Sequence, residues 1–213
     1  MDMHAAKSYS WLFWSLAILG FTLDQASKYG VFYHLDNGQA QNSLTIVPGV
    51  FDLSTRYIAE REAGEGLLPF LRSLNSERLP GVNHGALFGW GTNWGWDSNS
   101  FFAVVSVAAA LAIIYWSTRR ATREDLFLSL ALGLILAGTL GNLYDRLVFD
   151  GVRDFLHWYY VVDWPVFNFA DCCLVCGAGA LLAQAFFTEP VEQQAPPSAK
   201  PRELVESETI ARV

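Results

Sequence analysis

Charged side chains are scarce in this chain of 213 residues: Asp, Glu, Lys and Arg make up 16% of it, and hydrophobic residues 52%. That balance, with a mean hydropathy of +0.23, favours a small membrane protein of one domain over a water-soluble one. Positive charge is also in deficit. The net charge of −7 argues against a nucleic-acid partner, because no basic stripe is available to neutralise phosphates.

Signatures of several enzyme classes are missing as well. The chain contains no H-E-x-x-H, no G-x-S-x-G and no Walker A sequence, which argues against a zinc protease and an α/β-hydrolase. Its four histidines do not cluster in the sequence, so metal catalysis lacks obvious ligands. The residues therefore predict no metal site.

Cysteine is rare and confined to one apolar segment, as Cys172, Cys173 and Cys176. A secreted disulfide framework would need cysteines spread along the chain. Cys173 and Cys176 form a C-x-x-C pair. Apolar surroundings disfavour the reactive thiolate, so small side chains packing a membrane helix are the favoured interpretation. A redox role stays open as an alternative.

Four long apolar segments are present instead. Each approaches the roughly 20 residues that cross a bilayer as a helix, since backbone groups must pair internally in lipid. The predicted fold is therefore an all-α membrane protein with four transmembrane helices. We expect the first to be a retained helix rather than a cleaved signal peptide, because charges interrupt its end and no clean cleavage site follows. The segments are Trp11–Phe32, Phe101–Trp116, Leu126–Leu143 and Trp164–Phe187.

Positive charge in short loops indicates the orientation. Arg119, Arg120 and Arg123 lie between the second and third segments, so this loop and both termini are predicted to be cytoplasmic. The long first outer loop, residues 36–100, then faces the periplasm. Residues 189–213 are rich in Pro and polar residues and are predicted to be a disordered cytoplasmic tail that follows a four-helix transmembrane domain of residues 1–188.

Two acids stand out in this apolar context. Asp154 follows the third segment and Asp171 lies near the start of the fourth. Carboxylates at membrane depth are expensive and usually functional, and two that meet can share a proton for acid–base chemistry on water. Both fall near the outer membrane boundary, which water can reach. The sequence therefore predicts an active site near the periplasmic face.

Other polar residues allow two interpretations. Asp24 and Lys28 are spaced i, i+4, which suits either a helix salt bridge or the bracing of a site. Asp145 and Arg146 end the third segment. Such a pair can anchor a helix at the interface, or its arginine can stabilise developing negative charge.

Taken together, these segments resemble the signal peptidase II family, the bacterial lipoprotein signal peptidases. Five motifs occur in the family's order, which is far more specific than any one of them alone. They are Asp24-Gln25-x-Ser27-Lys28, Asn83-x-Gly85-Ala86, Gly141-Asn142-x-x-Asp145-Arg146, Val152-x-Asp154-Phe155 and Phe167-Asn168-x-Ala170-Asp171.

The resemblance implies an aspartic endopeptidase of the bacterial inner membrane, without metal or cofactor, that cleaves prolipoproteins before a diacylglyceryl-modified Cys. It implies a monomer in contact with membrane lipids, with a small extracytoplasmic β-cradle and a short helix in the first outer loop. By motif position Asp154 and Asp171 match the catalytic pair. Residues matching those that bind substrate or brace the site are Asp24, Lys28, Asn83, Gly85, Asn142, Asp145, Arg146 and Asn168.

One departure from the family pattern lies in the first outer loop. Residues 48–53 look like the family's cradle strand, but Asn83 does not follow promptly. We interpret Thr55 to Pro80 as a charged insertion, with a helix-like stretch around Tyr57 to Glu65, that tunes substrate access as a lid.

Two functions of other classes compete with the peptidase. An intramembrane acid also marks transporters and proton relays, although no repeat halves are visible. The cysteine pair would suit a membrane thiol oxidoreductase.

Overall fold

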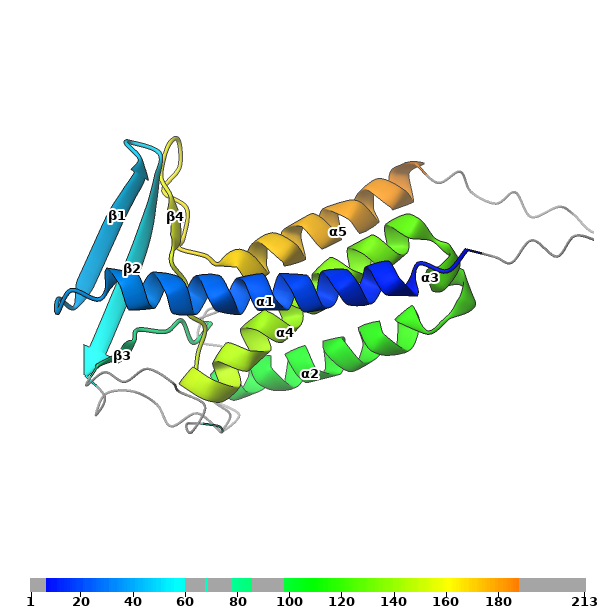
Figure 1. The fold of residues 1–213 in the computed structure, drawn as a ribbon, viewed down its shortest axis with the longest axis horizontal. Coiled ribbons are helices and arrows are strands. Elements are labelled where there is room, and N and C mark those ends of the chain that lie inside the picture. Colours follow the sequence, from blue (N-terminus) through cyan, green and yellow to red (C-terminus); the bar gives the residue numbers. More distant parts are fainter. Residues whose placement is uncertain (1–6, 60–67, 69–77, 86–97, 188–213) are drawn as a thin grey trace, which may run out of the picture.

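Helices running side by side make up most of the described part of the protein (Figure 1). The structure, a computed structural model, describes residues 7–59, 68, 78–85 and 98–187. The helices found in these ranges are α1 (Ser10–Leu35), α2 (Ser98–Ser117), α3 (Arg120–Glu124), α4 (Leu126–Phe149) and α5 (Phe169–Phe187).

Three of these helices are long and apolar enough to cross a membrane, namely α2, α4 and α5, taking the described residues alone. They confirm three of the four predicted spans. Helix α1 is long as well, with 26 residues, but its span stays a prediction. The second and third spans are longer than their apolar cores, because polar residues continue both helices.

The predicted boundaries at the site were wrong in two places. Helix α4 continues past Leu143 to Phe149, so Asp145 and Arg146 are helical and not part of the outer loop. Inside the protein Asp145 is paired with Lys28 and Arg153, and Arg146 donates to the Asn142 carbonyl, so both charged residues are accommodated within the helix. Helix α5 begins at Phe169 rather than Trp164, because Asn168 caps it.

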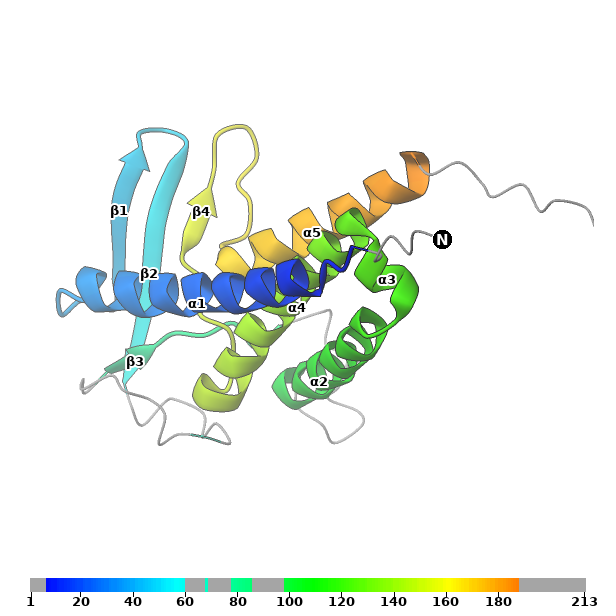
Figure 2. The same ribbon diagram turned by 45° about the vertical axis from the view of Figure 1, so that its right-hand side comes forward.

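A small antiparallel sheet gathers at one end of the helices (Figures 1 and 2). Strand β2 (Phe51–Ala59) is its centre. It pairs along its first part with β1 (Gln41–Val47) and β4 (Leu156–Trp158), and along its last residues with β3 (Arg78–Pro80). The segment between α4 and α5, which contains β4, thereby joins the first outer loop in one sheet. This sheet lies at the end of the bundle that carries the predicted site.

The proposed insertion begins as strand and not as helix. Tyr57 to Ala59 extend β2 and pair with Arg78 to Pro80, so the helix-like expectation is wrong for these residues; residues 60–65 lie outside the described part. The cause is tertiary. Tyr57 is buried against Phe32, and its hydroxyl donates to the Phe32 carbonyl at 2.5 Å, contacts that a local helical pattern does not anticipate.

Helix α4 is central to the packing, since it contacts α1, α2 and α5. Phe13, Ala17 and Leu136 are almost fully buried between α1 and α4. Close approach at the site end requires Gly141, because a Cβ there would lie 2.5 Å from Asp24 Oδ2. A small residue at this position permits the close helix contact, which brings Asp24 of α1 against α4.

Candidate active site

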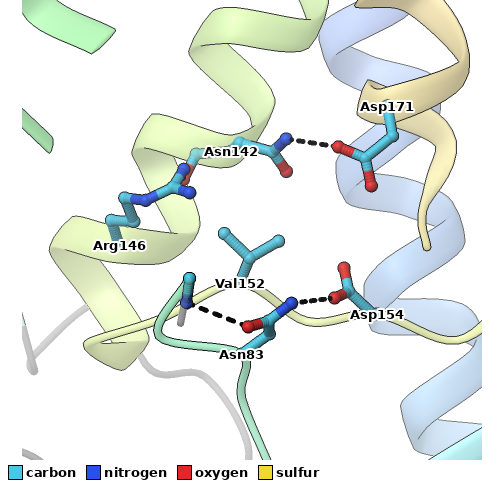
Figure 3. A pocket seen from close by; sticks show the side chains of 7 residues that line it. Asn83, Asn142, Arg146, Val152, Asp154 and Asp171 are labelled. Carbon is cyan, nitrogen blue, oxygen red and sulfur yellow. Dashed lines mark hydrogen bonds between the residues drawn. The ribbon is translucent and has the colours of Figure 1, made fainter. Parts of the chain in front are cut away.

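A polar pocket opens where α4 ends and α5 begins (Figure 3). Its volume of about 70 Å³ is enough for roughly two water molecules, at about 30 Å³ each. Four segments distant in sequence contribute to it. The lining residues are Asn83, Gly85, Asn142, Arg146, Val152, Asp154 and Asp171.

Asp154 lies in the loop between α4 and β4, where two side-chain amides hold its carboxylate. Asn83 Nδ2 donates to Oδ2 at 3.0 Å, and Asn168 Nδ2 donates to Oδ1 at 2.7 Å. Burial raises the pKa of Asp154 to about 6, with a smaller contribution in the same direction from the charge of Asp171, and the two amides act against this rise. A carboxyl group with this pKa is suited to proton transfer near neutral pH.

Asp171 is the third residue of α5 and takes part in the cap of that helix. Its backbone N–H donates to Asn168 Oδ1 at 3.1 Å, while the Asn168 N–H donates back to Asp171 Oδ2 at 3.1 Å. This reciprocal arrangement is a capping box. The other oxygen, Oδ1, accepts from Asn142 Nδ2 at 2.9 Å. The cap therefore fixes the carboxylate at the positive end of the helix.

One amide joins the two acids. Asn168 caps the helix that carries Asp171 with its side-chain oxygen, and its side-chain nitrogen reaches Asp154. The same nitrogen lies 3.2 Å from Asn142 Oδ1. In Figure 3 the two carboxylates lie one above the other on the same side of the pocket. The structure thus brings together Asp154 and Asp171 as the sequence predicted.

The orientation of Asn83 is set by its own loop. Its backbone pairs with Val152 through bonds of 2.7 and 2.9 Å, and its Oδ1 accepts from the Gly85 N–H at 2.9 Å. Gly85 has φ of 72°, a conformation that side chains other than glycine's disfavour. With Oδ1 occupied in this way, the donor nitrogen of Asn83 is directed at Asp154.

Arg146 faces the two acids across the pocket (Figure 3). Its Nη1 donates to the Asn142 carbonyl at 3.3 Å, and its Nε is buried without a partner among the residues that the structure describes. The guanidinium lies 5.4 Å from the ring centroid of Phe102. A cation held in this way, with a donor left over, is placed to receive a carbonyl or an oxyanion.

Behind the pocket lies a group of four buried charged residues, called here the ion cluster: Asp24, Lys28, Asp145 and Arg153. All four are 0% exposed. Lys28 Nζ lies 2.8 Å from Asp24 and 3.3 Å from Asp145, and Arg153 Nη2 lies 2.7 Å from Asp145. Each buried charge therefore lies next to a charge of opposite sign, which compensates it in a place that water does not solvate.

The ion cluster also contacts the residues around the acids. Lys28 Nζ donates to Asn142 Oδ1 at 3.3 Å, which directs the Asn142 amide nitrogen at Asp171. Asp24 Oδ1 accepts from the Ala170 N–H at 2.9 Å, at the first turn of α5. Asp24 and Lys28 thus form a helix salt bridge and also contact residues of the site. The two interpretations of this pair, a salt bridge and the bracing of a site, are therefore compatible.

Two residues of this region were missed by sequence reasoning. Arg153 belongs to the ion cluster, and Gln25 accepts from it at 2.8 Å and donates to Asp24 at 2.9 Å. The motif around Asp154 does not specify residue 153. The only sign in the sequence that Arg153 matters is its position next to an expected active-site acid. Gln25 belongs to the motif that begins at Asp24, but the sequence alone assigned it no role in the site.

The cysteines lie on α5 as free thiols, with Cys173 buried, Cys172 half-buried and Cys176 exposed. Cys173 Sγ lies 3.6 Å from where a Cβ on Gly20 would be, a contact typical of helix packing. Within the described ranges, no group of three or more His, Cys, Asp or Glu residues is placed to hold a metal ion.

Comparisons with known proteins identify the family of the chain. The family described as "Signal peptidase (SPase) II" matches residues 70–187. This chain belongs to the signal peptidase II family. The lipoprotein signal peptidase of Rhodopirellula baltica is 36% identical over 188 residues, covering 82% of this chain and 71% of that protein. The one of Pseudomonas fluorescens strain Pf0-1 is 31% identical over 180 residues, covering 83% and 87%.

The fold has a counterpart among solved structures. A bacterial membrane enzyme solved by the in meso method at 1.9 Å resolution matches 88% of this chain and 100% of its own, with a TM-score of 0.61 and 23% identity. As a signal peptidase II, the protein is an aspartic-type peptidase of the bacterial inner membrane that removes signal peptides from prolipoproteins. The oxidoreductase and transport alternatives are not favoured.

Proposed function

We propose that Asp154 and Asp171 are the catalytic pair with which this peptidase cleaves prolipoproteins before the diacylglyceryl-modified Cys. The observation that carries the proposal is their shared attachment to Asn168, which directs acids from a loop and a helix into one pocket. Two carboxyl groups in such a place share one proton, and their titration belongs to the pair.

The chemistry follows from that shared proton. The ionised carboxylate takes a proton from a water molecule as the water attacks the scissile carbonyl, and the protonated partner donates to the carbonyl oxygen. The proton taken from water then passes to the leaving nitrogen as the C–N bond breaks. Asp154, with a pKa raised to about 6, holds the proton at the start. Asp171, at the positive end of α5, is the partner that takes the proton from water.

The surrounding residues have separate tasks. Asn83 and Asn168 hold Asp154 in place, while Asn142 holds Asp171. Gly85 provides the turn that orients Asn83. Arg146, which lines the pocket, binds a substrate carbonyl or stabilises the oxyanion.

The membrane arrangement follows the same proposal. Helix α1, at 26 residues about 39 Å long, is the fourth span, and its internal charges are paired against α4. The start of α1 and the end of α5 lie at the α3 end of the bundle (Figure 2), and α3 and the residue before it carry Arg119, Arg120 and Arg123. That end faces the cytoplasm, and the pocket and sheet face the periplasm.

The sheet and the exposed helix faces complete the proposal. The sheet is the extracytoplasmic cradle that receives substrate beside the pocket. Exposed apolar side chains of α2 and α5, such as Leu111 and Phe186, contact lipid, and the enzyme acts as a monomer.

The test uses purified full-length protein with a synthetic prolipoprotein, in parallel with the same substrate lacking the diacylglyceryl group. Mass spectrometry identifies the cleaved bond. We expect cleavage before the lipidated Cys only, unaffected by EDTA, and no cleavage by Asp154→Asn or Asp171→Asn. Cleavage by either variant at the wild-type rate would reject the pair, and restoration of an EDTA-treated enzyme by added zinc would reject the metal-free mechanism.

A further inference from the structure

Arg153 is a fully buried arginine that makes several side-chain contacts, while its Nη1 has no hydrogen-bond partner among the residues that the structure describes. Its Nε and Nη2 form a fork on Asp145, at 3.2 and 2.7 Å, and Nη2 also donates to Gln25. The rings of Tyr29 and Phe149 lie on the guanidinium at 4.2 and 4.1 Å from their centroids. Only arginine, with its planar fork, can satisfy these contacts together.

The backbone of Arg153 is attached to the same carboxylate. Its N–H donates to Asp145 Oδ2 at 2.9 Å, so one acid on α4 holds both the main chain and the side chain. The preceding residue, Val152, is paired with Asn83, and the following residue is Asp154. The peptide that carries Asp154 is therefore fixed on α4 through the residue next to it.

Arg153 also balances charge. The ion cluster contains two carboxylates and two cations, and Lys28 and Arg153 share Asp145. Removal of Arg153 would leave one unbalanced negative charge behind the pocket.

Other charged groups face the same region from each helix packed there. Asp154 faces Asp171 of α5, Lys28 of α1 and Arg146 of α4. Beside Arg153 itself are the phenols of Tyr29 and Tyr144, which hydrogen bond to each other at 3.0 Å. None of these groups can replace the lost positive charge at Asp145, because Lys28 already bridges Asp24 and Asp145.

We propose that Arg153 is a positioning residue for the catalytic pair, which fixes the main chain before Asp154 and keeps the ion cluster electrically neutral. The inference rests on the proposed function of Asp154 and Asp171. It has two separable consequences. Loss of the fork displaces Asp154 and lowers kcat, since small misplacements of a reacting group can cost on the order of 100-fold. Loss of the charge makes Asp154 bind its proton more tightly and moves the pH profile to higher pH.

Three substitutions separate these consequences in the full-length enzyme. Arg153→Lys keeps the charge and loses the fork, Arg153→Met loses both, and Arg153→Met with Asp145→Asn restores neutrality. Arg120→Met is the matched control, because Arg120 is ion-paired with Glu124 at the opposite end and is exposed. The measurement is kcat against pH at saturating lipidated prolipoprotein, with circular dichroism as the check on folding.

We expect Arg153→Lys to lose about 10- to 100-fold in kcat with an unmoved pH profile. Arg153→Met should lose as much and shift the profile upward by about one pH unit, and the double variant should return the profile to that of wild type. Arg120→Met should match wild type in both. A role in folding alone would lower the yield or stability of the variants without moving the pH profile.

Wild-type kcat and pH profile in folded Arg153→Met would overturn the proposal. Should that variant not fold, Arg153→Lys decides, since wild-type kcat in it rejects a positioning role. Asp154→Asn and Asp171→Asn are measured alongside. If they remain active the proposed function itself fails, whereas if they are inactive and the Arg153 variants behave as wild type, only the inference on Arg153 fails.

Discussion

The ion cluster and the pocket contain the same kind of acid in opposite surroundings. In the cluster, Asp24 and Asp145 are 0% exposed, and each has a lysine or arginine nitrogen within 2.8 Å. In the pocket, Asp154 and Asp171 are partly exposed and are held by amides. A cation at contact distance compensates the negative charge of a buried carboxylate, whereas an amide orients the group and brings no opposite charge. Cation pairing thus separates acids that hold the fold from acids that can react.

The largest expected effect is on the pocket side of this comparison. Asp154→Asn and Asp171→Asn keep the shape of each side chain but cannot share a proton. We expect each to lower kcat by about 10⁴-fold, the upper range for acid–base groups, with the fold retained. Single-turnover cleavage and circular dichroism measure the two properties. If either variant lost a hundredfold less than this, an amide would be sufficient for catalysis at that position. The distinction between reactive acids in the pocket and structural acids in the ion cluster would then be wrong.

Breaking the cluster should act on stability instead. Lys28→Met leaves Asp24 and Asp145 facing each other without their shared cation, and such unbalanced buried charge costs about 3–5 kcal/mol. Denaturant unfolding in detergent measures the change in free energy. Arg120→Met, which breaks an exposed pair, is the control and should change it by less than about 1 kcal/mol. Equal stability of the two variants would contradict the structural role of the cluster.

Asn168 connects the two acids of the pocket, and its replacement tests whether capping or orientation matters. We expect Asn168→Ala to lower kcat by about 100-fold through misplacement of both acids and stability by about 1 kcal/mol through loss of the cap. Asp125→Ala is the matched variant, because Asp125 caps α4 at the far end by accepting from the Leu128 N–H. It should lose similar stability at unchanged kcat. If kcat were equal in Asn168→Ala and Asp125→Ala, the role of Asn168 would be helix capping alone, without orientation of the acids.

The pH dependence of stability should distinguish Asp154 from a paired acid. Its pKa is raised from 3.8 to about 6, so the folded state binds the proton more tightly than the unfolded state. This contribution to stability is full below pH 3.8 and is lost as the pH rises through about 6. Unfolding at several pH values should show wild type losing stability relative to Asp154→Asn between these limits. A constant difference would mean that burial does not raise this pKa.

The smallest effect is expected from the insertion, which contains no residue of the five motifs. Because Ala59 pairs with Arg78, residues 60–77 can be replaced by a short Gly-Ser turn that leaves β2 and β3 intact. We expect a change in KM or substrate preference with single-turnover cleavage of bound substrate unchanged, as for a lid. Loss of cleavage from folded protein at saturating substrate would show that the insertion supplies a chemical group.

Much of the site was predictable from local sequence, and the misses have a common cause. Asp154 and Asp171 were identified because acids are rare beside apolar segments, and Asn168 because it belongs to a motif. Arg153 and Gln25 were missed because their importance comes from partners on other helices. The strand at Tyr57 was missed because its burial against Phe32 outweighs local helical preference.

The amino-acid sequence by itself determined the apolar helices, the acids at their outer ends and the family, since these depend on composition and order along the chain. The tertiary structure alone decided which acids are paired with cations and which are left to share a proton. The physical reason is that charge compensation acts through space over a few ångströms. Lys28, Asp145 and Arg153 come from α1, α4 and the loop after it, and only packing brings their charges into contact.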